Sequence, residues 1–106
     1  MNKVKPLKKF GQNYLTDQNA VRKIVAEIDP QSGDNLIEIG PGQGALTKYL
    51  YAACKNYSAV EIDTRVIESL KTEYNNINII NADFLKTDIT KFGTDLRIVG
   101  NIPYNI

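Results

Sequence analysis

Residues 36–45, LIEIGPGQGA, decide the class of fold for this 106-residue chain. The run from Leu36 to Ile39 is mainly apolar and ends at Gly40, which is typical of a buried strand. Glycines at this point allow the backbone to turn tightly. The apolar residues that follow recur at the spacing of one helix face: Leu46, Tyr49, Leu50 and Ala53. The stretch therefore predicts a strand, a glycine turn and a helix, in that order.

The same alternation of elements continues on both sides of this unit. Further strands are expected at 57–62, 77–80 and 96–99, and further helices at 20–28 and 64–74. The first of these helices has Thr16 or Asp17 to cap its start, and residues 29–33 (DPQSG) break it. Strands and helices that alternate at this spacing form βαβ units with right-handed crossovers. We therefore expect an α/β, Rossmann-like fold with a parallel sheet and flanking helices.

The composition excludes several kinds of site. The chain has no histidine and one cysteine, Cys54, so an internal disulfide is excluded, and neither a zinc site nor a Ser-His or Cys-His nucleophile is expected. No apolar run approaches the roughly 20 residues that a membrane span needs, and no signal peptide precedes the basic start. We expect a cytoplasmic protein with no metal and no membrane partner.

The charges are distributed unevenly along the chain. Up to Lys23 there are six basic residues and one acidic residue, whereas the remainder holds seven basic and eleven acidic residues. A basic arm on an otherwise acidic domain suits a polyanionic partner such as RNA. Its candidate phosphate contacts are Lys3, Lys5, Lys8 and Lys9. A solvated tail without a partner explains the same charges.

Three features follow the ends of expected strands and form a candidate ligand site. Gly40, Gly42 and Gly44 let backbone N–H groups approach a ligand at a helix N-terminus, but this turn also fits the G-x-G-x-x-G/A pattern of dinucleotide-binding folds. Glu61, about twenty residues further on, can accept from both hydroxyls of an adenosine ribose. Asp83 can accept from an adenine amino group, although an Asp in such a position is more often a turn residue. These features are consistent with a dinucleotide and with S-adenosylmethionine.

The segment Asn101-Ile102-Pro103-Tyr104 follows the fourth expected strand directly. It resembles the N-P-P-Y or N-L/I-P-Y motif of enzymes that methylate the amino groups of bases. The Asn101 side-chain carbonyl and the Ile102 backbone carbonyl can accept the two N–H groups of an adenine amine, which aims its lone pair at a sulfonium methyl group. Pro103 stiffens the turn, and Tyr104 offers a ring on which a flipped-out base stacks. This motif favours methyl transfer over the chemistry of a nicotinamide or flavin oxidoreductase.

Five ordered motifs resemble the rRNA adenine N6-dimethyltransferases, a family that includes KsgA (RsmA) and the Erm resistance methylases. They are residues 9–15 (KFGQNYL), residues 38–47 (EIGPGQGALT), Glu61-Ile62-Asp63, Asp83 and residues 101–106 (NIPYNI). The resemblance implies the class I S-adenosylmethionine-dependent methyltransferase fold. It also implies that the cofactor contacts Asn13 and Leu15 in addition to Gly40, Gly42, Gly44, Glu61, Asp83 and Asn101.

Within this family the chain resembles the KsgA type most, because of Phe10-Gly11-Gln12, Pro41 and the run from Gly44 to Thr47. The KsgA type implies dimethylation of two adjacent adenosines in small-subunit (16S) rRNA, a step of ribosome biogenesis. Ile102 is shared with Erm sequences, which implies one adenosine of large-subunit (23S) rRNA as the alternative substrate. A DNA adenine methyltransferase and a non-catalytic RNA-binding or ribosome-assembly module are further alternatives.

The four expected strands cover the first part of such a fold. A doubly wound sheet of four strands would leave its fourth strand with a bare edge. We therefore expect residues 1–15 to be a basic arm that also contacts the cofactor, and residues 16–106 to be the N-terminal part of the methyltransferase domain. On this expectation the chain binds S-adenosylmethionine weakly, does not methylate RNA alone, and can self-associate through the bare edge.

Overall fold

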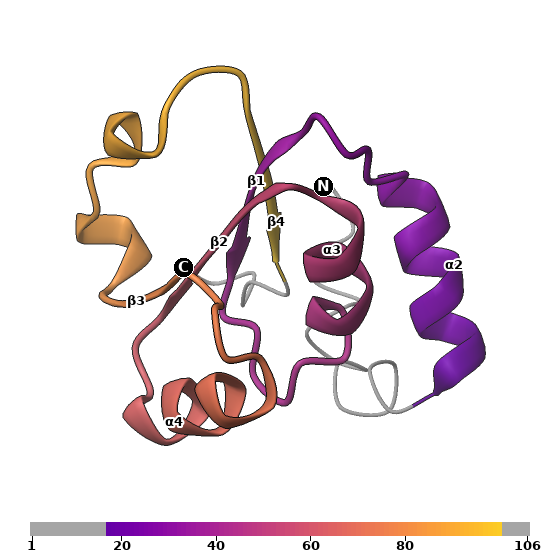
Figure 1. Cartoon of the computed structure of the whole chain (residues 1–106), viewed down its shortest axis with the longest axis horizontal. Coiled ribbons are helices and arrows are strands. Elements are labelled where there is room, and N and C mark those ends of the chain that lie inside the picture. Colours follow the sequence, from indigo (N-terminus) through magenta and orange to yellow (C-terminus); the bar gives the residue numbers. More distant parts are fainter. Residues whose placement is uncertain (1–16, 101–106) are drawn as a thin grey trace.

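The computed structural model describes residues 17–100, which form a parallel sheet of four strands with helices between them (Figure 1). The strands are β1 (Asn35–Ile39), β2 (Asn56–Glu61), β3 (Ile79–Asn81) and β4 (Leu96–Gly100). They lie in the order β3-β2-β1-β4, and each neighbouring pair is parallel. The chain runs outward from β1 to β3 and then returns to the other side of β1, which places a topological switch point between β1 and β4. The predicted α/β class is confirmed.

Three α-helices accompany the sheet: α2 (Gln18–Ile28), α3 (Thr47–Ala53) and α4 (Thr64–Glu73). The first begins at a predicted cap, because the Asp17 carboxylate accepts from backbone N–H groups that the helix leaves unpaired. It ends at Asp29, whose φ of 48° is left-handed. The Asp63 carboxylate caps α4 by accepting from the backbone N–H of Arg65. Local polar residues therefore fix where α2 and α4 begin.

The third strand differs from the sequence prediction. The expected strand covered residues 77–80, whereas β3 spans Ile79–Asn81. The backbone N–H of Ile77 donates to the carbonyl of Tyr74 at 3.1 Å, so Ile77 still belongs to the turn that closes α4. Its side chain is nevertheless buried, which explains why the apolar pattern included it. Two 3-10 turns, η1 (Phe84–Lys86) and η2 (Ile89–Phe92), occupy the connection to β4.

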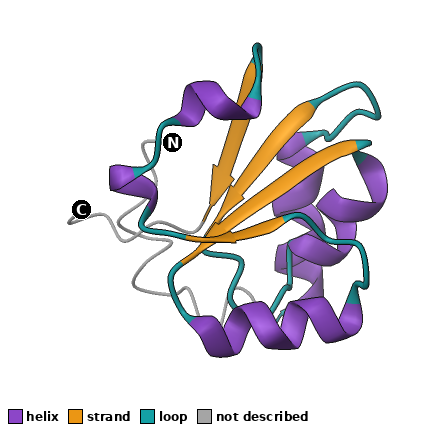
Figure 2. Cartoon of the chain, turned by 60° about the vertical axis from the view of Figure 1, so that its left-hand side comes forward, coloured by secondary structure: helices purple, strands orange, loops and turns teal. Residues whose placement is uncertain are grey.

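All three α-helices cover one face of the sheet, whereas η1 and η2 lie away from them (Figure 2). Strand side chains on the helix-covered face form a core with apolar residues of the helices. The strand members are Leu36, Tyr57, Ala59 and Ile79, and the α-helical members are Val21, Leu50, Ile67 and Leu70. Alternation along the strands places Ile37, Ile80 and Ile98 on the opposite face, where Ile98 is 42% exposed.

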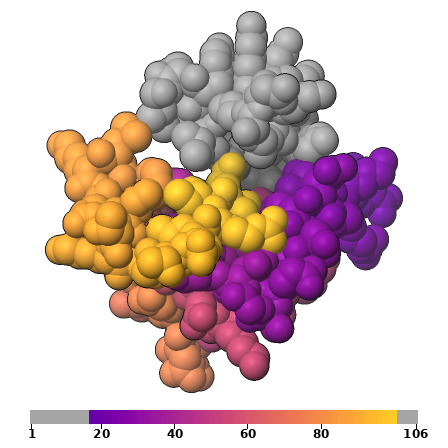
Figure 3. Space-filling view, turned by 90° about the horizontal axis from the view of Figure 1, so that it is seen from above, coloured from indigo at the N-terminus to yellow at the C-terminus, as the bar shows by residue number. Residues whose placement is uncertain are grey.

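The edge strand β4 is joined to the end of α2 by Arg97. The guanidinium donates to the backbone carbonyls of Ile28 and Asp29 and to the Asp34 carboxylate, the last at 2.6 Å. Carbonyls at a helix end lack partners within the helix, so Arg97 supplies them. Figure 3 shows the yellow segment that contains β4 at the surface, between the orange turns and the indigo region of α2. Arg97 therefore fixes β4, and with it Gly100, beside β1.

Candidate functional site

The carboxyl ends of the four parallel strands meet at one edge of the sheet. Gly40 follows β1 directly, Glu61 ends β2, and Asp83 follows β3 after one intervening residue. Gly100, at the end of β4, pairs with Ile39 at the end of β1. Ligands of doubly wound sheets bind at this edge, beside the point where the strand order reverses. The structure therefore brings the predicted glycine turn, Glu61 and Asp83 to one edge of the sheet, and this edge is the candidate ligand site.

The turn between β1 and α3 has a backbone that glycine tolerates best. Gly40, Gly42 and Gly44 have φ angles of 62°, 57° and 86°, all in the left-handed region. The backbone N–H of Gly44 donates to the carbonyl of Pro41 at 3.0 Å and closes the turn. A Cβ at Gly44 would lie 3.1 Å from Leu70 Cδ2, whereas a Cβ at Gly40 would meet no heavy atom within 4 Å among the residues that the structure describes. Gly44 thus packs against α4, and none of the described side chains fills the space beside Gly40.

The Glu61 carboxylate is held at the edge by three backbone N–H groups. One oxygen accepts from Gly42 at 3.3 Å, and the other accepts from Ile62 at 3.1 Å and from Asp63 at 3.0 Å. The residue is 8% exposed. An ionised carboxylate can accept about four hydrogen bonds, so it retains acceptor capacity for a hydroxyl group. The bond to Gly42 joins the glycine turn directly to the end of β2.

Asp83 has a local role at the same edge. One carboxylate oxygen accepts from the backbone N–H of Leu85 at 3.0 Å and caps η1. The side-chain amide of the neighbouring Asn81 donates to the backbone carbonyls of Glu61 and Ile62, which ties the end of β3 to the end of β2. Asp83 therefore acts as a turn residue in this structure, and a contact between Asp83 and adenine stays a prediction.

Two exposed apolar side chains at this edge were not predicted as site residues. Ile62 is 68% exposed and Leu85 is 70% exposed. Ile62 directly follows Glu61, and Leu85 lies two residues after Asp83. Apolar side chains beside a few polar groups are typical of small-molecule sites. The sequence held little signal for either residue, because Ile62 lay inside the expected strand 57–62, which ends one residue earlier as β2, and Leu85 belongs to no strand.

A buried carboxyl group lies beneath the glycine turn. Glu38 is 2% exposed, and its Oε1 accepts from the hydroxyl of Thr47 at 2.7 Å and from the hydroxyl of Tyr57 at 2.6 Å. Burial raises the pKa of Glu38 above its ordinary value, and the two hydrogen bonds oppose that rise. Burial also raises the pKa of the Tyr57 hydroxyl. The sequence showed a charged residue in an apolar run but gave no sign of its partners.

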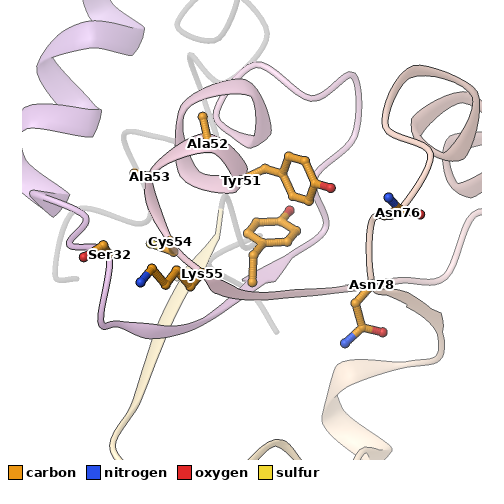
Figure 4. A pocket seen from close by; sticks show the side chains of 9 residues that line it. Ser32, Tyr51, Ala52, Ala53, Cys54, Lys55, Asn76 and Asn78 are labelled. Atoms are coloured by element: carbon orange, nitrogen blue, oxygen red, sulfur yellow. The ribbon is translucent and has the colours of Figure 1, made fainter.

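A pocket of about 600 Å³ opens at the opposite end of the sheet (Figure 4). Its lining includes Ser32, Lys55 and Asn78, which precede strands, together with the ring of Tyr51. A smaller hollow of about 370 Å³ adjoins the glycine turn at Gly44. The larger pocket contains none of the predicted ligand contacts. The carboxyl edge is therefore the better candidate site, because the strand order reverses there.

Two further observations concern residues 17–100. In that part of the chain, no group of three or more His, Cys, Asp or Glu side chains is arranged to hold a metal ion. None of the helices in the same range is long and apolar enough to cross a membrane. The remaining predicted site residues lie outside the described range: Lys3, Lys5, Lys8, Lys9, Asn13, Leu15, Asn101, Ile102, Pro103 and Tyr104.

Known proteins of similar sequence include enzymes that modify ribosomal RNA. The family described as Ribosomal RNA adenine dimethylase matches residues 3–106. A Coxiella burnetii protein named Ribosomal RNA small subunit methyltransferase A is 48% identical, over 100% of this chain and 43% of its own length. The protein of the same name from Prosthecochloris aestuarii is 43% identical, over 93% of this chain and 39% of its own length. The chain thus spans about two fifths of the length of these relatives.

Two solved structures share the fold. A dimethyladenosine transferase from Plasmodium falciparum has a TM-score of 0.72 and 34% identity, over 85% of this chain and 34% of its own. The 23S rRNA methyltransferase ErmE has a TM-score of 0.70 and 30% identity, over 85% of this chain and 37% of its own. These similarities confirm the class I methyltransferase fold that the sequence motifs predicted. The chain belongs to the ribosomal RNA adenine dimethylase family.

Proposed function

We propose that the chain binds S-adenosylmethionine at the carboxyl edge of its sheet, as the cofactor-binding part of an rRNA adenine N6-dimethyltransferase. One observation carries the proposal: the backbone N–H of Gly42 donates to the Glu61 carboxylate at 3.3 Å. The glycine turn and the acidic end of β2 are therefore close enough for one ligand to contact both. Family membership supports a methyl donor over a dinucleotide. Residues 16–106 then form the cofactor-binding part, and residues 1–15 a basic arm that adds cofactor contacts at Asn13 and Leu15.

Each group at the edge contacts a different part of the proposed cofactor. The backbone at Gly40 lets the ligand approach closely, because no side chain between residues 17 and 100 fills the space beside it. Glu61 accepts hydrogen bonds from the ribose hydroxyls, and Asp83 accepts from the adenine amino group. The exposed side chains of Ile62 and Leu85 pack against the adenine ring.

The transfer step is assigned to the motif that follows β4. The bound cofactor supplies a methyl group made electrophilic by a sulfonium. The carbonyls of Asn101 and Ile102 accept the two adenine N–H groups and hold the amine in line with that methyl group. The cofactor, when bound, would supply this methyl group with a neutral thioether as the leaving group, and no residue would need to act as a general base beforehand, because the amine N–H becomes acidic only after the nitrogen gains the methyl group. Tyr104 stacks on the flipped-out base, and Pro103 stiffens the turn.

The proposed substrate is a pair of adjacent adenosines in small-subunit rRNA, in the cytoplasm. The relatives that are 43% and 48% identical are named for the small subunit, whereas the 23S rRNA methyltransferase ErmE is 30% identical. Large-subunit rRNA is therefore the second candidate substrate. Phosphate contacts are proposed for Lys3, Lys5, Lys8 and Lys9. Self-association through β4 is a further part of the proposal, because β4 is an edge strand of the described sheet.

Thermal denaturation with two ligands tests the cofactor assignment. A ligand that binds only the native state raises Tm, so S-adenosylmethionine should raise the Tm of the chain and NAD should not. Glu61→Gln should reduce the shift, because an amide offers the ribose hydroxyls fewer acceptor sites. Glu27→Gln, an exposed change in α2, is the matched control and should keep the full shift. A shift with NAD alone, or an equal loss of shift in both variants, contradicts the proposal.

Methyl transfer to unmethylated small ribosomal subunits tests the catalytic assignment. Asn101→Ala in the enzyme should abolish transfer with a modest loss of cofactor affinity, because Asn101 holds the amine. Glu61→Ala should mainly weaken cofactor binding, because Glu61 holds the ribose. Near-normal transfer by Asn101→Ala would show that the amine is positioned by another group.

A further inference from the structure

Glu38 is a buried polar residue in the middle of the core that no part of the proposed reaction uses. It lies in β1, two residues before Gly40, and is 2% exposed. The sheet register places Ala59 of β2 on one side of it and Val99 of β4 on the other. A carboxyl group in such surroundings destabilises the fold unless hydrogen bonds compensate, and an apolar residue would fill the space at lower cost. Stability alone therefore does not explain a carboxyl group at position 38.

The first partner of Glu38 joins the two ends of the glycine turn. Thr47 is the first residue of α3 and is fully buried, and its hydroxyl donates to Glu38 Oε1 at 2.7 Å. A Cβ built on Gly44 would lie 3.8 Å from Thr47 Cβ, so this side chain also borders the turn. Residues 40–46 are thus enclosed between a strand residue and a helix residue that are hydrogen-bonded to each other. The hydrogen bond from Thr47 to Glu38 therefore joins the strand before the turn to the helix after it.

The second partner links the same carboxyl group to β2. The Tyr57 hydroxyl donates to Glu38 Oε1 at 2.6 Å. The Tyr57 ring is held edge-on by Tyr51 of α3 at a centroid distance of 5.6 Å, and Tyr51 contacts Tyr74 at 5.1 Å. Because β2 continues to Glu61, the contact aligns the strand that carries the acidic site residue with the strand that enters the turn. Glu38 therefore connects both sides of the candidate ligand site from below.

We propose that Glu38 is a positioning residue that sets the shape of the glycine turn through Thr47 and aligns the turn with β2 through Tyr57. It acts through these hydrogen bonds and not by charge contact with the ligand. The effect of Glu38 on cofactor affinity rests on the proposed function, whereas its effect on the conformation of the glycine turn does not. Among the residues of the described range, the ionisable groups that face Glu38 are Tyr57 and Glu61 from β2 and Tyr74 from the end of α4. The carboxylate of Glu61 raises the pKa of Glu38, in the same direction as burial.

Amide hydrogen exchange in the unliganded chain tests the effect on the turn. The reporter is the N–H of Gly44, which is bonded to Pro41 within the turn. Glu38→Ala and Thr47→Val should each speed its exchange by at least about tenfold relative to the N–H of Val25 within α2, which corrects for global stability. Glu38→Gln keeps an oxygen that accepts both hydroxyls and should leave the exchange within about threefold of wild type. Unchanged exchange in Glu38→Ala and in Thr47→Val overturns the proposal.

Cofactor affinity, measured by isothermal titration with S-adenosylmethionine, separates positioning from charge. Glu38→Ala should weaken binding at least about tenfold, Thr47→Val and Tyr57→Phe at least about threefold, and Glu38→Gln less than threefold. Ser58→Ala is the matched control, since it removes the partly buried hydrogen bond from the Asn78 side-chain amide at 2.9 Å without touching the turn, and it should bind as wild type does. If Glu38→Ala does not fold, Thr47→Val and Tyr57→Phe decide the outcome.

Two results distinguish this proposal from the proposed function. Equal weakening by Glu38→Gln and Glu38→Ala, with normal binding by Thr47→Val and Tyr57→Phe, means that the charge of Glu38 contacts the ligand, and the positioning role is wrong. Absence of S-adenosylmethionine binding to the wild-type chain contradicts the proposed function, and the exchange of the Gly44 N–H then still decides whether Glu38 shapes the turn.

Discussion

Replacing Gly40 by alanine tests whether the proposed cofactor occupies the space beside the glycine turn. Gly40 has a φ of 62°, and a Cβ there would meet no heavy atom of residues 17–100 within 4 Å. The substitution therefore creates no steric clash with this part of the chain. The new methyl group nevertheless occupies the space that the proposed cofactor enters. The effect on folding and the effect on binding can accordingly be estimated separately.

The folding effect of Gly40→Ala comes from the backbone. A non-glycine residue in the left-handed region costs about 1–2 kcal/mol, and the loss of glycine from the unfolded chain offsets about 0.4–1 kcal/mol. The free energy of unfolding should therefore fall by about 1 kcal/mol, which corresponds to about 4–8 °C in Tm for a domain of this size. Binding should weaken at least about tenfold, equivalent to about 1.4 kcal/mol, because the methyl group excludes the ligand.

The assay is Tm across a titration of S-adenosylmethionine, for wild type, Gly40→Ala and Gly33→Ala. Gly33 is the matched control, because a Cβ there also meets no described heavy atom within 4 Å, but Gly33 lies before β1, away from the carboxyl edge. Gly33→Ala should follow the wild-type titration, and Gly40→Ala should need at least about ten times more ligand for the same increase in Tm. Superimposable titrations of Gly40→Ala and wild type would refute the inference that the ligand enters beside Gly40.

Three further predictions concern stability. Gly44→Ala should lower the free energy of unfolding by about 2–4 kcal/mol in urea denaturation, because strain at a φ of 86° adds to a Cβ placed 3.1 Å from Leu70; a smaller loss than that of Gly40→Ala would contradict this. Arg97→Ala should lower the free energy of unfolding by about 1–3 kcal/mol, because it removes the hydrogen bonds to Ile28, Asp29 and Asp34. The control Arg65→Ala breaks the exposed ion pair with Asp63 and should change the same free energy by less than about 0.5 kcal/mol. Equal losses in the two variants would argue against the role of Arg97. The raised pKa of Glu38 means that its neutral form favours folding, so its contribution is complete below the ordinary value of 4.5 and is lost as pH rises through the folded pKa. The free energy of unfolding of wild type should therefore fall relative to that of Glu38→Gln as pH rises above 4.5, by up to about 1.4 kcal/mol per pH unit. A difference between the two proteins that does not change with pH would show that burial does not perturb the pKa of Glu38.

The order of elements and the place of the candidate site could be predicted because local patterns decide them. Apolar runs that end in glycine or an acidic residue identified β1 and β2, and the crossover rule then put their carboxyl ends at one edge. The glycines of the turn were informative because only a few residue types tolerate a positive φ. A cap at Thr16 or Asp17 could be predicted for the same kind of reason, and the structure has it at Asp17, whose hydrogen bonds reach two and three residues along the chain.

Contacts between distant parts of the chain could not be predicted from the sequence. Arg97 bonds residues 63 to 69 positions earlier, and the two partners of Glu38 lie 9 and 19 positions away in different elements. The start of β3 was misplaced because Ile77 is apolar and buried yet is bonded within a turn, and burial alone does not reveal a backbone partner. Asp83 shows a related limit, since one residue type serves a turn and a ligand equally well.

The most direct test of the ligand site is an NMR titration of the isotope-labelled chain with S-adenosylmethionine. Binding at the carboxyl edge predicts that backbone signals of Gly40, Gly42, Ile62 and Asp83 move with one dissociation constant. Signals of Ser32, Lys55 and Asn78, at the other end of the sheet, should stay in place. Movement confined to those three residues, or no saturable change at the glycine turn, would contradict the site described for this chain.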